Sequence, residues 1–212
     1  MEKCVIRQLV LGMVETNCYF LLNKETKELI VVDPADSAGR IQEFAKQIGG
    51  KPVGILLTHG HFDHFMAMDA LRDAWGVPVY ADAAEAGVLG DCRKNLSYGM
   101  GGCPMETHAD VYLTDGDEFV LAGFGIRMLH TPGHTPGGCC YYLESEKILL
   151  SGDTLFEGSC GRTDFPGGSM TTLVRSIQEK LFTLPEDVLV FPGHGGNTTI
   201  GEEKRYNFVA QM

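Results

Sequence analysis

The stretch ILLTHGHFDH, Ile55 to His64, decides how the fold is interpreted, because an uninterrupted apolar run leads directly into a dense polar cluster. His59, His61, Asp63 and His64 fall within six residues. Residues that alternate along an extended segment project to the same side, so two of these histidines can face one ion. The last two donors turn into the helix expected after the cluster. The pattern predicts a metal-binding loop at the end of a strand.

Composition and charge limit the classes of protein to which the chain can belong. Its 212 residues suit one α/β domain spanning residues 1–212, and 44% hydrophobic with 21% charged residues is typical of globular proteins. No apolar run approaches the roughly 18 residues of a membrane-spanning helix, and the start lacks the features of a secretory signal. We therefore expect a cytoplasmic protein with no membrane partner. The net charge of −11 argues against nucleic acid as a partner.

The remaining segments alternate between strand and helix patterns, which favours a layered α/β fold. A helix is expected over 40–48 and another over 65–75. A third is expected after an N-cap at Ser169, with a shared apolar face formed by Met170, Leu173, Val174, Ile177 and Leu181. Residues 82–110 contain many glycines and are expected to be loop-rich. The expected strands are Val5–Leu11, Cys18–Leu22, Leu29–Val32, Val53–Leu57, Val77–Tyr80, Phe119–Leu121, Ile126–Leu129, Cys139–Leu143, Ile148–Leu150 and Val188–Phe191.

Four apolar strands each run directly into a polar cluster that contains His or Asp. The four stretches are ILLTHGHFDH, IRMLHTPGH, ILLSGDT and VLVFPGH. Strands lying side by side bring their equivalent ends together, and ligands bind at such strand ends, so the clusters are expected to meet. The candidate metal ligands are His59, His61, Asp63, His64, His134, Asp153 and His194.

Seven imidazole and carboxylate groups are enough for two metal ions that share a carboxylate. Donors of this kind suit zinc first, with iron or manganese as alternatives. Two cations lower the pKa of a shared water toward neutrality, which predicts hydrolysis. The seven cysteines include no C-x-x-C pair, so reduced thiols are expected, with Cys139 and Cys140 packed in a strand.

The run His59-Gly60-His61-Phe62-Asp63-His64 resembles the H-x-H-x-D-H signature of the metallo-β-lactamase superfamily, and later donors follow in that family's order. The resemblance implies an αββα sandwich of two mixed sheets flanked by helices. It also implies that His59, His61 and His134 hold one metal ion, that Asp63, His64 and His194 hold the other, and that Asp153 bridges them. Asp33 is expected to support the site from behind the ligands.

The aspartate at position 153 disfavours a β-lactamase, since the zinc lactamases usually have cysteine as the corresponding ligand. The stretch GDTLFEGSCGRTDFPGG, 152–168, resembles instead the glyoxalase II (hydroxyacylglutathione hydrolase) branch, in its short bacterial form. That resemblance implies a thioesterase using a metal-bridging hydroxide, with an acyl thioester of a small thiol as its substrate. Arg162 and Ser159 become candidates for substrate contact, and Asp63 for orienting the hydroxide. The chain ends before most of the C-terminal helical domain of full-length glyoxalase II.

Several alternatives stay open at this point. Persulfide dioxygenases share the GRTDF stretch and use one iron, for which His59, His134 and Asp153 would be the ligands. A lactonase and a metal-binding module without turnover are two further possibilities. Arg162 and Asp164 can either form a salt bridge that shapes the loop or contact substrate. His130 is expected to be a hydrogen-bonded structural residue, and a homodimer is only a default expectation for the assembly.

Overall fold

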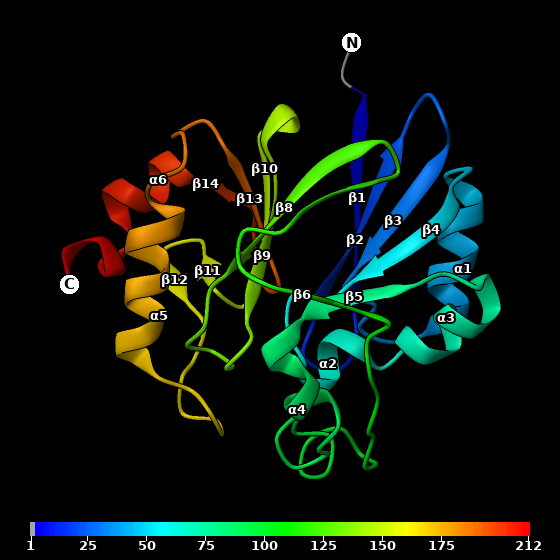
Figure 1. The fold of residues 1–212 in the computed structure, drawn as a ribbon, viewed down its shortest axis with the longest axis horizontal. Helices are drawn as coiled ribbons and strands as arrows, with labels where there is room; N and C mark the ends of the chain where they lie inside the picture. The colour runs from blue at the N-terminus through cyan, green and yellow to red at the C-terminus, as the bar shows by residue number, and fades with distance from the viewer. Residues whose placement is uncertain (1–2) are drawn as a thin grey trace.

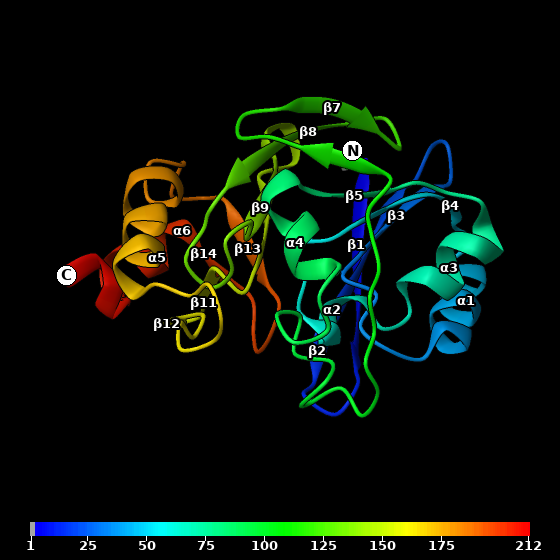
Figure 2. The same ribbon diagram turned by 60° about the horizontal axis from the view of Figure 1, so that its bottom comes forward.

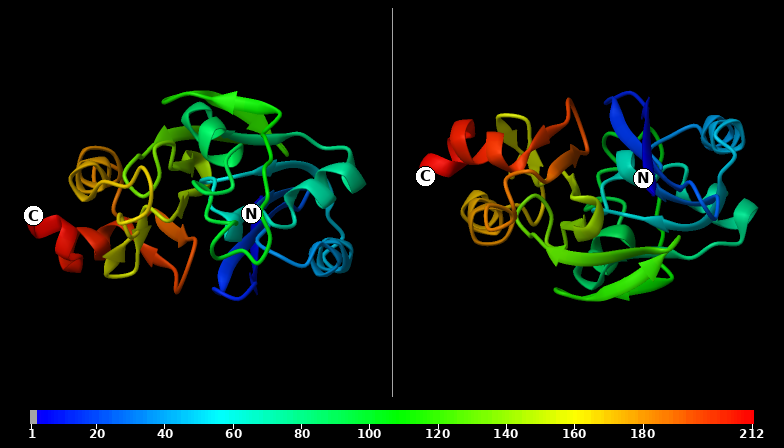
Figure 3. Two further views of the ribbon diagram at one scale, coloured as in Figure 1. Left: turned by 90° about the horizontal axis from the view of Figure 1, so that it is seen from below. Right: turned by 90° about the horizontal axis from the view of Figure 1, so that it is seen from above.

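The computed structural model describes residues 3–212 and has two mixed six-stranded sheets packed face to face. Helices α1 and α3 cover the outer face of one sheet, and α5 with α6 covers that of the other (Figure 1). The end-on views of Figure 3 show the same four layers. The predicted αββα sandwich is therefore confirmed. No described helix is long and apolar enough to cross a membrane.

The first sheet begins as an antiparallel meander and continues with parallel strands. Strands β1, β2 and β3 pair antiparallel, whereas β3, β4, β5 and β6 run parallel to their neighbours. The parallel crossovers place α1 and α3 on the outer face. Their order in the sheet follows the chain: β1 (Cys4–Leu11), β2 (Thr16–Asn23), β3 (Glu28–Val32), β4 (Lys51–Leu56), β5 (Val79–Asp82) and β6 (Val111–Leu113).

The second sheet is mostly antiparallel, with one parallel pair between β10 and β13. Its strands, in spatial order, are β14 (Thr198–Thr199), β13 (Leu189–Pro192), β10 (Ile148–Gly152), β9 (Cys139–Leu143), β8 (Phe124–His130) and β7 (Glu118–Leu121). A small hairpin of β11 (Leu155–Phe156) and β12 (Ser159–Cys160) lies between β10 and α5 along the chain.

The helices are short. They are α1 (Ala38–Gln47), α2 (Phe62–Phe65), α3 (Met68–Trp75), α4 (Ala86–Leu89), α5 (Met170–Ser176) and α6 (Ile200–Tyr206), together with the single turns Ala83–Glu85, Glu144–Glu146 and Phe208–Gln211 and the π-helical turn Ile177–Leu181.

Apolar side chains form three layers of core, as the four-layer architecture requires. One layer lies between the two sheets and contains Tyr141, Leu150 and Phe124. A second joins the first sheet to α1 and α3, and the third joins the second sheet to α5. Cys139 and Cys140 are buried on opposite faces of β9, in agreement with their predicted packing role.

The helix expected over 65–75 is two helices, which corrects the prediction. α2 starts earlier, at Phe62, and α3 starts at Met68. The amide of Ala67 donates to the carbonyl oxygen of Pro34 at 3.0 Å, in the loop after β3, and this tertiary bond accompanies the break. Asp63 and His64 thus lie within a short helix that follows closely after the end of β4.

The segment 82–110 is more regular than its glycines suggest. Asp82 accepts a hydrogen bond from the amide of Ala84 at 2.8 Å and so caps the turn that leads into α4. Gly87 lies inside that helix, facing open space, and does not interrupt it. Only the part after α4 is a long loop.

The cap predicted for α5 is present, since Ser169 accepts from the amide of Thr172 at 3.3 Å. Leu173, Val174 and Ile177 are buried against the second sheet as expected, but Met170 is exposed. Met170 is the first residue of α5 and is 38% exposed, so the face of the helix that packs on the sheet begins at Leu173 and does not include Met170.

The core assignment predicts the stability of a matched pair of variants. Phe20 is fully buried and packs on Phe44, with ring centroids 4.8 Å apart. Phe20→Ala should lower the free energy of unfolding by about 3–5 kcal/mol, because a cavity remains where the ring was. Val120→Ala, at a side chain that is 74% exposed, should change it by less than about 0.5 kcal/mol. Urea denaturation followed by circular dichroism measures both, and equal losses would contradict the assignment.

Candidate metal centre

The structure brings all seven predicted donors together at one edge of the sandwich, where strands of both sheets end. Within the described residues, three overlapping groups place one donor atom from each member within 4.8 Å of the others. The first group is His59, His61 and His134, and the second group is Asp63, His64 and His194. The remaining set, His59, His64 and Asp153, shares one histidine with each of these two groups.

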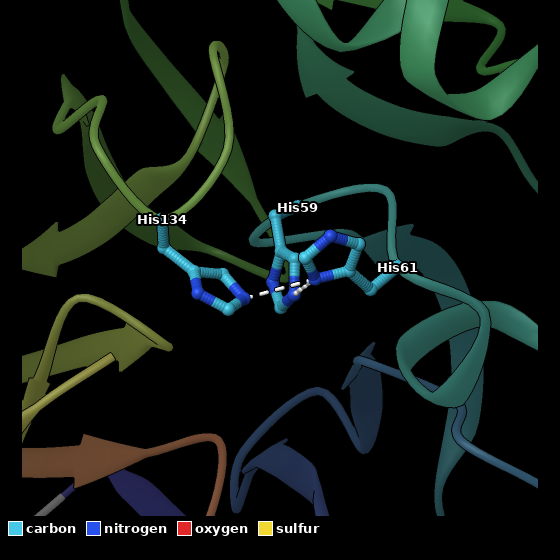
Figure 4. A group of neighbouring side chains, drawn as sticks. All are labelled: His59, His61 and His134. Atoms are coloured by element: carbon cyan, nitrogen blue, oxygen red, sulfur yellow. Dashed lines mark hydrogen bonds between the residues drawn. The ribbon is translucent and has the colours of Figure 1, made fainter. Parts of the chain in front are cut away.

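The first group consists of three imidazole rings that converge on one point (Figure 4). His59 Nε2 lies 3.1 Å from His61 Nδ1, which lies 2.9 Å from His134 Nε2. The other ring nitrogen of His134, Nδ1, donates to the carbonyl oxygen of Arg162 at 2.6 Å. That bond fixes the tautomer, so a lone pair on His134 Nε2 faces the other two rings.

The surroundings of His59 and His61 keep these two imidazoles neutral. Burial lowers the pKa of His59 well below its ordinary value, and the charges of His64 and His134 lower it further. Burial and the proximity of His134 lower the pKa of His61 in the same way. Neutral imidazole is the form that binds metal ions.

The second group combines two imidazoles with a carboxylate. Asp63 Oδ2 lies 3.4 Å from both His64 Nε2 and His194 Nε2. The same oxygen accepts a hydrogen bond from Thr16 Oγ1 at 2.8 Å, which orients the carboxylate. Burial opposes ionisation of Asp63, but His64, His194 and Thr16 outweigh it and lower its pKa, so the carboxylate is anionic.

Asp153 lies between the two groups. Its Oδ1 is 3.5 Å from His64 Nε2, and its Oδ2 is 3.5 Å from both His134 Nε2 and His194 Nε2. One carboxylate is therefore close to histidines of both groups.

Asp33 has the supporting position predicted for it. The residue adopts a left-handed conformation with φ of 49°, which turns the chain sharply after β3. Its buried carboxylate accepts hydrogen bonds from the amide and hydroxyl of Thr58, at 2.8 and 2.7 Å. It also lies 3.0 Å from His64 Nδ1. One side chain thus holds the start of the polar loop and one ring of the second group.

The electrostatics around His64 favour a cation. Burial lowers its pKa, but Asp63, Asp33 and Asp153 outweigh that effect and raise the pKa to about 10. Such a shift reports strong negative potential at a buried point. The same potential would attract a metal ion, which would replace the proton on Nε2.

Unpartnered atoms at the base of the site fit a bound metal. Among the described residues, His64 Nε2 and Asp153 Oδ1 are buried polar atoms without a hydrogen-bond partner, a state that costs free energy. A Cβ at Gly193 would lie 2.2 Å from Asp153 Oδ1, so only glycine lets this backbone come so near. The donor set and its unpartnered atoms suit a divalent ion.

The predicted substrate residues lie on the wall of a cavity of about 370 Å³ that opens above the donors. Arg162 is exposed and forms two hydrogen bonds with Asp164, so the salt bridge considered from the sequence is present. Ser159 lies in the β11–β12 hairpin and is also exposed. The cavity is lined by Val14, His61, Phe62, Asp63, Leu96, Met100, His134, Asp153, Phe156, Ser159, Cys160, Arg162, Phe165 and His194.

The two remaining histidines lie outside the cluster. His130 Nδ1 is 2.6 Å from Asp82 Oδ2, consistent with the structural role expected for it. His108 is exposed in the loop before β6. Met100, in the loop after α4, lines the cavity.

Sequence reasoning missed Glu85, a buried carboxylate that joins the loops of the first donor group. It accepts a hydrogen bond from the amide of Gly60 at 2.6 Å and another from the amide of Gly137 at 2.7 Å. Gly60 lies between His59 and His61, whereas Gly137 follows His134 on the other sheet. Both bonds go to backbone amides, which leave no signal in the sequence.

The position of Glu85 predicts an effect on metal binding. Glu85→Ala should weaken binding of a divalent ion by about 10–100-fold, because the loops carrying His59 and His134 lose their common partner. Titration of the metal-free protein with Zn²⁺ in competition with a chromophoric chelator measures the affinity directly.

Glu203 offers the matched control. It is equally buried, and it accepts hydrogen bonds from Gly158 and Asn207 near α6, away from the donors. Glu203→Ala should reduce stability but leave metal affinity within about twofold. Equal weakening in both variants would show that Glu85 acts only through overall stability.

Comparisons with known proteins agree with the geometry. Residues 11–194 match the family described as the metallo-beta-lactamase superfamily. The chain is 39% identical over 202 residues to the probable metallo-hydrolase YqgX of Bacillus subtilis, with 95% of each chain covered. It is 35% identical to hydroxyacylglutathione hydrolase GloC of Haemophilus influenzae, over 91% of this chain and 92% of that one.

Solved structures share the fold over nearly the whole chain. BLEG-1, titled a B3 metallo-beta-lactamase, is 42% identical with a TM-score of 0.92, covering 97% of this chain and 99% of that one. TTHA1623 in a di-iron-bound form is 34% identical with a TM-score of 0.84, covering 95% and 98%. ETHE1 from Myxococcus xanthus is 29% identical with a TM-score of 0.80, covering 96% and 83%. The chain belongs to the metallo-β-lactamase superfamily of metal-dependent hydrolases.

Proposed function

We propose that this chain hydrolyses thioesters of small thiols, in the manner of a hydroxyacylglutathione hydrolase, with two divalent metal ions. The observation that carries the proposal is the pair of complete donor groups with Asp153 between them, at the base of an open cavity. The 35% identity to GloC, a protein named for this activity, supports the substrate class.

The proposed ligands follow the two groups. His59, His61 and His134 would hold one ion, and Asp153 would contribute to both sites. Asp63, His64 and His194 would hold the other. Zinc suits these donors, and iron is the second candidate because TTHA1623, a similar structure, is titled a di-iron form.

Bound metal ions would supply a water of lowered pKa and would polarise the substrate carbonyl. Residues of the chain itself would orient the water and contact the substrate. Thr16 fixes the anionic Asp63, which can accept a hydrogen bond from the attacking water and orient it toward the cavity. A thiolate leaves readily, so the site needs no strong general acid. Ser159 and Arg162 would contact the substrate from the hairpin and from the loop after it.

A persulfide dioxygenase is the second candidate, favoured by the GRTDF stretch at 161–165, which resembles those enzymes. One iron held by His59, His134 and Asp153 would serve that reaction. The complete group of Asp63, His64 and His194 favours the two-metal proposal, because a one-iron centre leaves these donors without a ligand role.

The deciding experiment compares four substrate classes, thioesters, persulfides, lactones and β-lactams, on protein of known metal content. We expect hydrolysis of S-lactoylglutathione, followed by loss of its thioester absorbance, with two metal ions per chain. Oxygen uptake on glutathione persulfide with one iron per chain would overturn the proposal in favour of the dioxygenase. A β-lactam belongs in the panel because BLEG-1 is titled a β-lactamase. Inactivity on thioesters, lactones and β-lactams with metal bound would indicate a binding module.

A carboxylate variant tests the role proposed for Asp63. Asp63→Asn should lower kcat for thioester hydrolysis by about 10²–10⁴-fold, because an amide cannot act as an anionic acceptor for the water. Metal content is measured on the same samples. Asp187→Asn, at an exposed carboxylate paired with Lys147, should leave kcat unchanged. Full activity in Asp63→Asn with both metals bound would contradict the role.

A further inference from the structure

Apolar side chains surround the mouth of the cavity although several of them are open to solvent. Val14 is 37% exposed and Met100 is 44% exposed, and both line the cavity above the donors. Leu96, Phe156 and Phe165 are half-buried on the same wall. Exposed apolar side chains gathered at one opening mark a place where an apolar group binds.

Backbone contacts hold one side of this mouth in place. The turn between β1 and β2 carries Val14, and Asn17 at its base binds the loop of His194. The amide of Asn17 donates to the carbonyl oxygen of Gly193 at 2.8 Å, and its side chain donates to that of Pro192 at 2.9 Å. Val14 is therefore tied to the loop that carries a donor of the second group.

The loop after α4 forms another side of the mouth, on the edge of the molecule that carries the site (Figure 2). Asn95 is fully buried, accepts from the amide of Phe62 at 2.8 Å and donates to the carbonyl oxygen of Met105 at 2.8 Å. This residue fastens the loop to the start of α2 and so fixes Leu96 and Met100 beside the cavity.

The mouth of the cavity carries little positive charge, and a carboxylate of the same chain already pairs with it. Arg162 is the one lysine or arginine among the described residues that line the cavity, and Asp164 binds it with two hydrogen bonds. Its guanidinium also lies over the ring of Phe165, 4.0 Å from the centroid. An anionic arm of a substrate would have to compete with Asp164 and approach a chain of net charge −11.

We infer that the site selects thioesters with an apolar group next to the reacting carbonyl and with little negative charge, in preference to lactoyl thioesters of glutathione. The inference rests on the proposed function and specifies its substrate class. The apolar group can belong to the acyl chain or to the thiol, since the cavity offers the same wall to either. Burial of each methylene should raise kcat/KM by about three- to fourfold until the wall is filled.

Two series of substrates separate these sources. The first varies the acyl group from acetyl to octanoyl on the neutral thiol N-acetylcysteamine. The second keeps an acetyl group and compares benzyl mercaptan with glutathione as the thiol. A rise in kcat/KM along the first series would place the apolar group on the acyl chain. A preference for the benzyl mercaptan thioester in the second series would place it on the thiol. The inference predicts that at least one series shows the rise.

Two valines on one hairpin provide a matched pair of variants. Val14 lines the cavity, whereas Val10 is 51% exposed on the same hairpin and is not among the lining residues. Val14→Ser should raise KM for the preferred apolar thioester by about fivefold with kcat unchanged. Val10→Ser should change neither constant.

The outcomes distinguish this inference from the proposed function. Inactivity on every thioester with two metals bound would overturn both. Efficient hydrolysis of S-lactoylglutathione, with no gain along either series and equal constants in Val14→Ser and Val10→Ser, would overturn the inference alone. Equal metal content in all variants is the control that excludes a damaged centre.

Discussion

The contact between the end of β4 in one sheet and the first residues of β9 in the other is the constraint on which the rest of the site depends. The amide of Cys139, at the start of β9, donates to the carbonyl oxygen of Thr58, just after β4, at 2.9 Å. The hydroxyl of Tyr141 donates to the carbonyl oxygen of Leu57 at 2.9 Å. These bonds cross from one sheet to the other immediately beside the polar loop. They fix where the strand ends of both sheets meet, and the donors follow from that alignment.

Burying so many polar groups at one edge costs free energy, and hydrogen bonds and charges from neighbouring side chains offset that cost. Asp33 satisfies Thr58 and balances the charge of His64, while Glu85 satisfies two backbone amides and connects the loops of His59 and His134. A buried carboxylate is costly unless it is well hydrogen-bonded, so each has several donors around it. Among the described residues, three of the six buried side-chain polar atoms without a hydrogen-bond partner belong to the donors, namely His61 Nε2, His64 Nε2 and Asp153 Oδ1. This is a physical reason to regard the cluster as a metal centre.

The sequence was sufficient for the donors, because they follow local patterns, whereas local patterns alone indicated only a layered α/β fold. The αββα sandwich was predicted from the resemblance to the superfamily. An apolar strand followed by His or Asp can be recognised directly in the sequence. The alternation of His59 and His61 also predicted that their side chains face one ion. The contacts that support the donors could not be predicted from the sequence. Glu85 binds backbone amides, Asn95 binds backbone on two sides, and the break at Ala67 depends on the carbonyl group of Pro34. Such partners lie far apart in sequence and can be any residue type, so only the fold reveals them.

The most direct test of the account is to count the metal ions at this edge. Crystals of metal-loaded protein, with diffraction recorded above and below the absorption edge of the bound metal, locate each ion by its anomalous signal. Two peaks are predicted, one in contact with His59, His61 and His134 and the other with Asp63, His64 and His194. A single peak in contact with His59, His134 and Asp153, in protein saturated with metal, would contradict the two-metal centre.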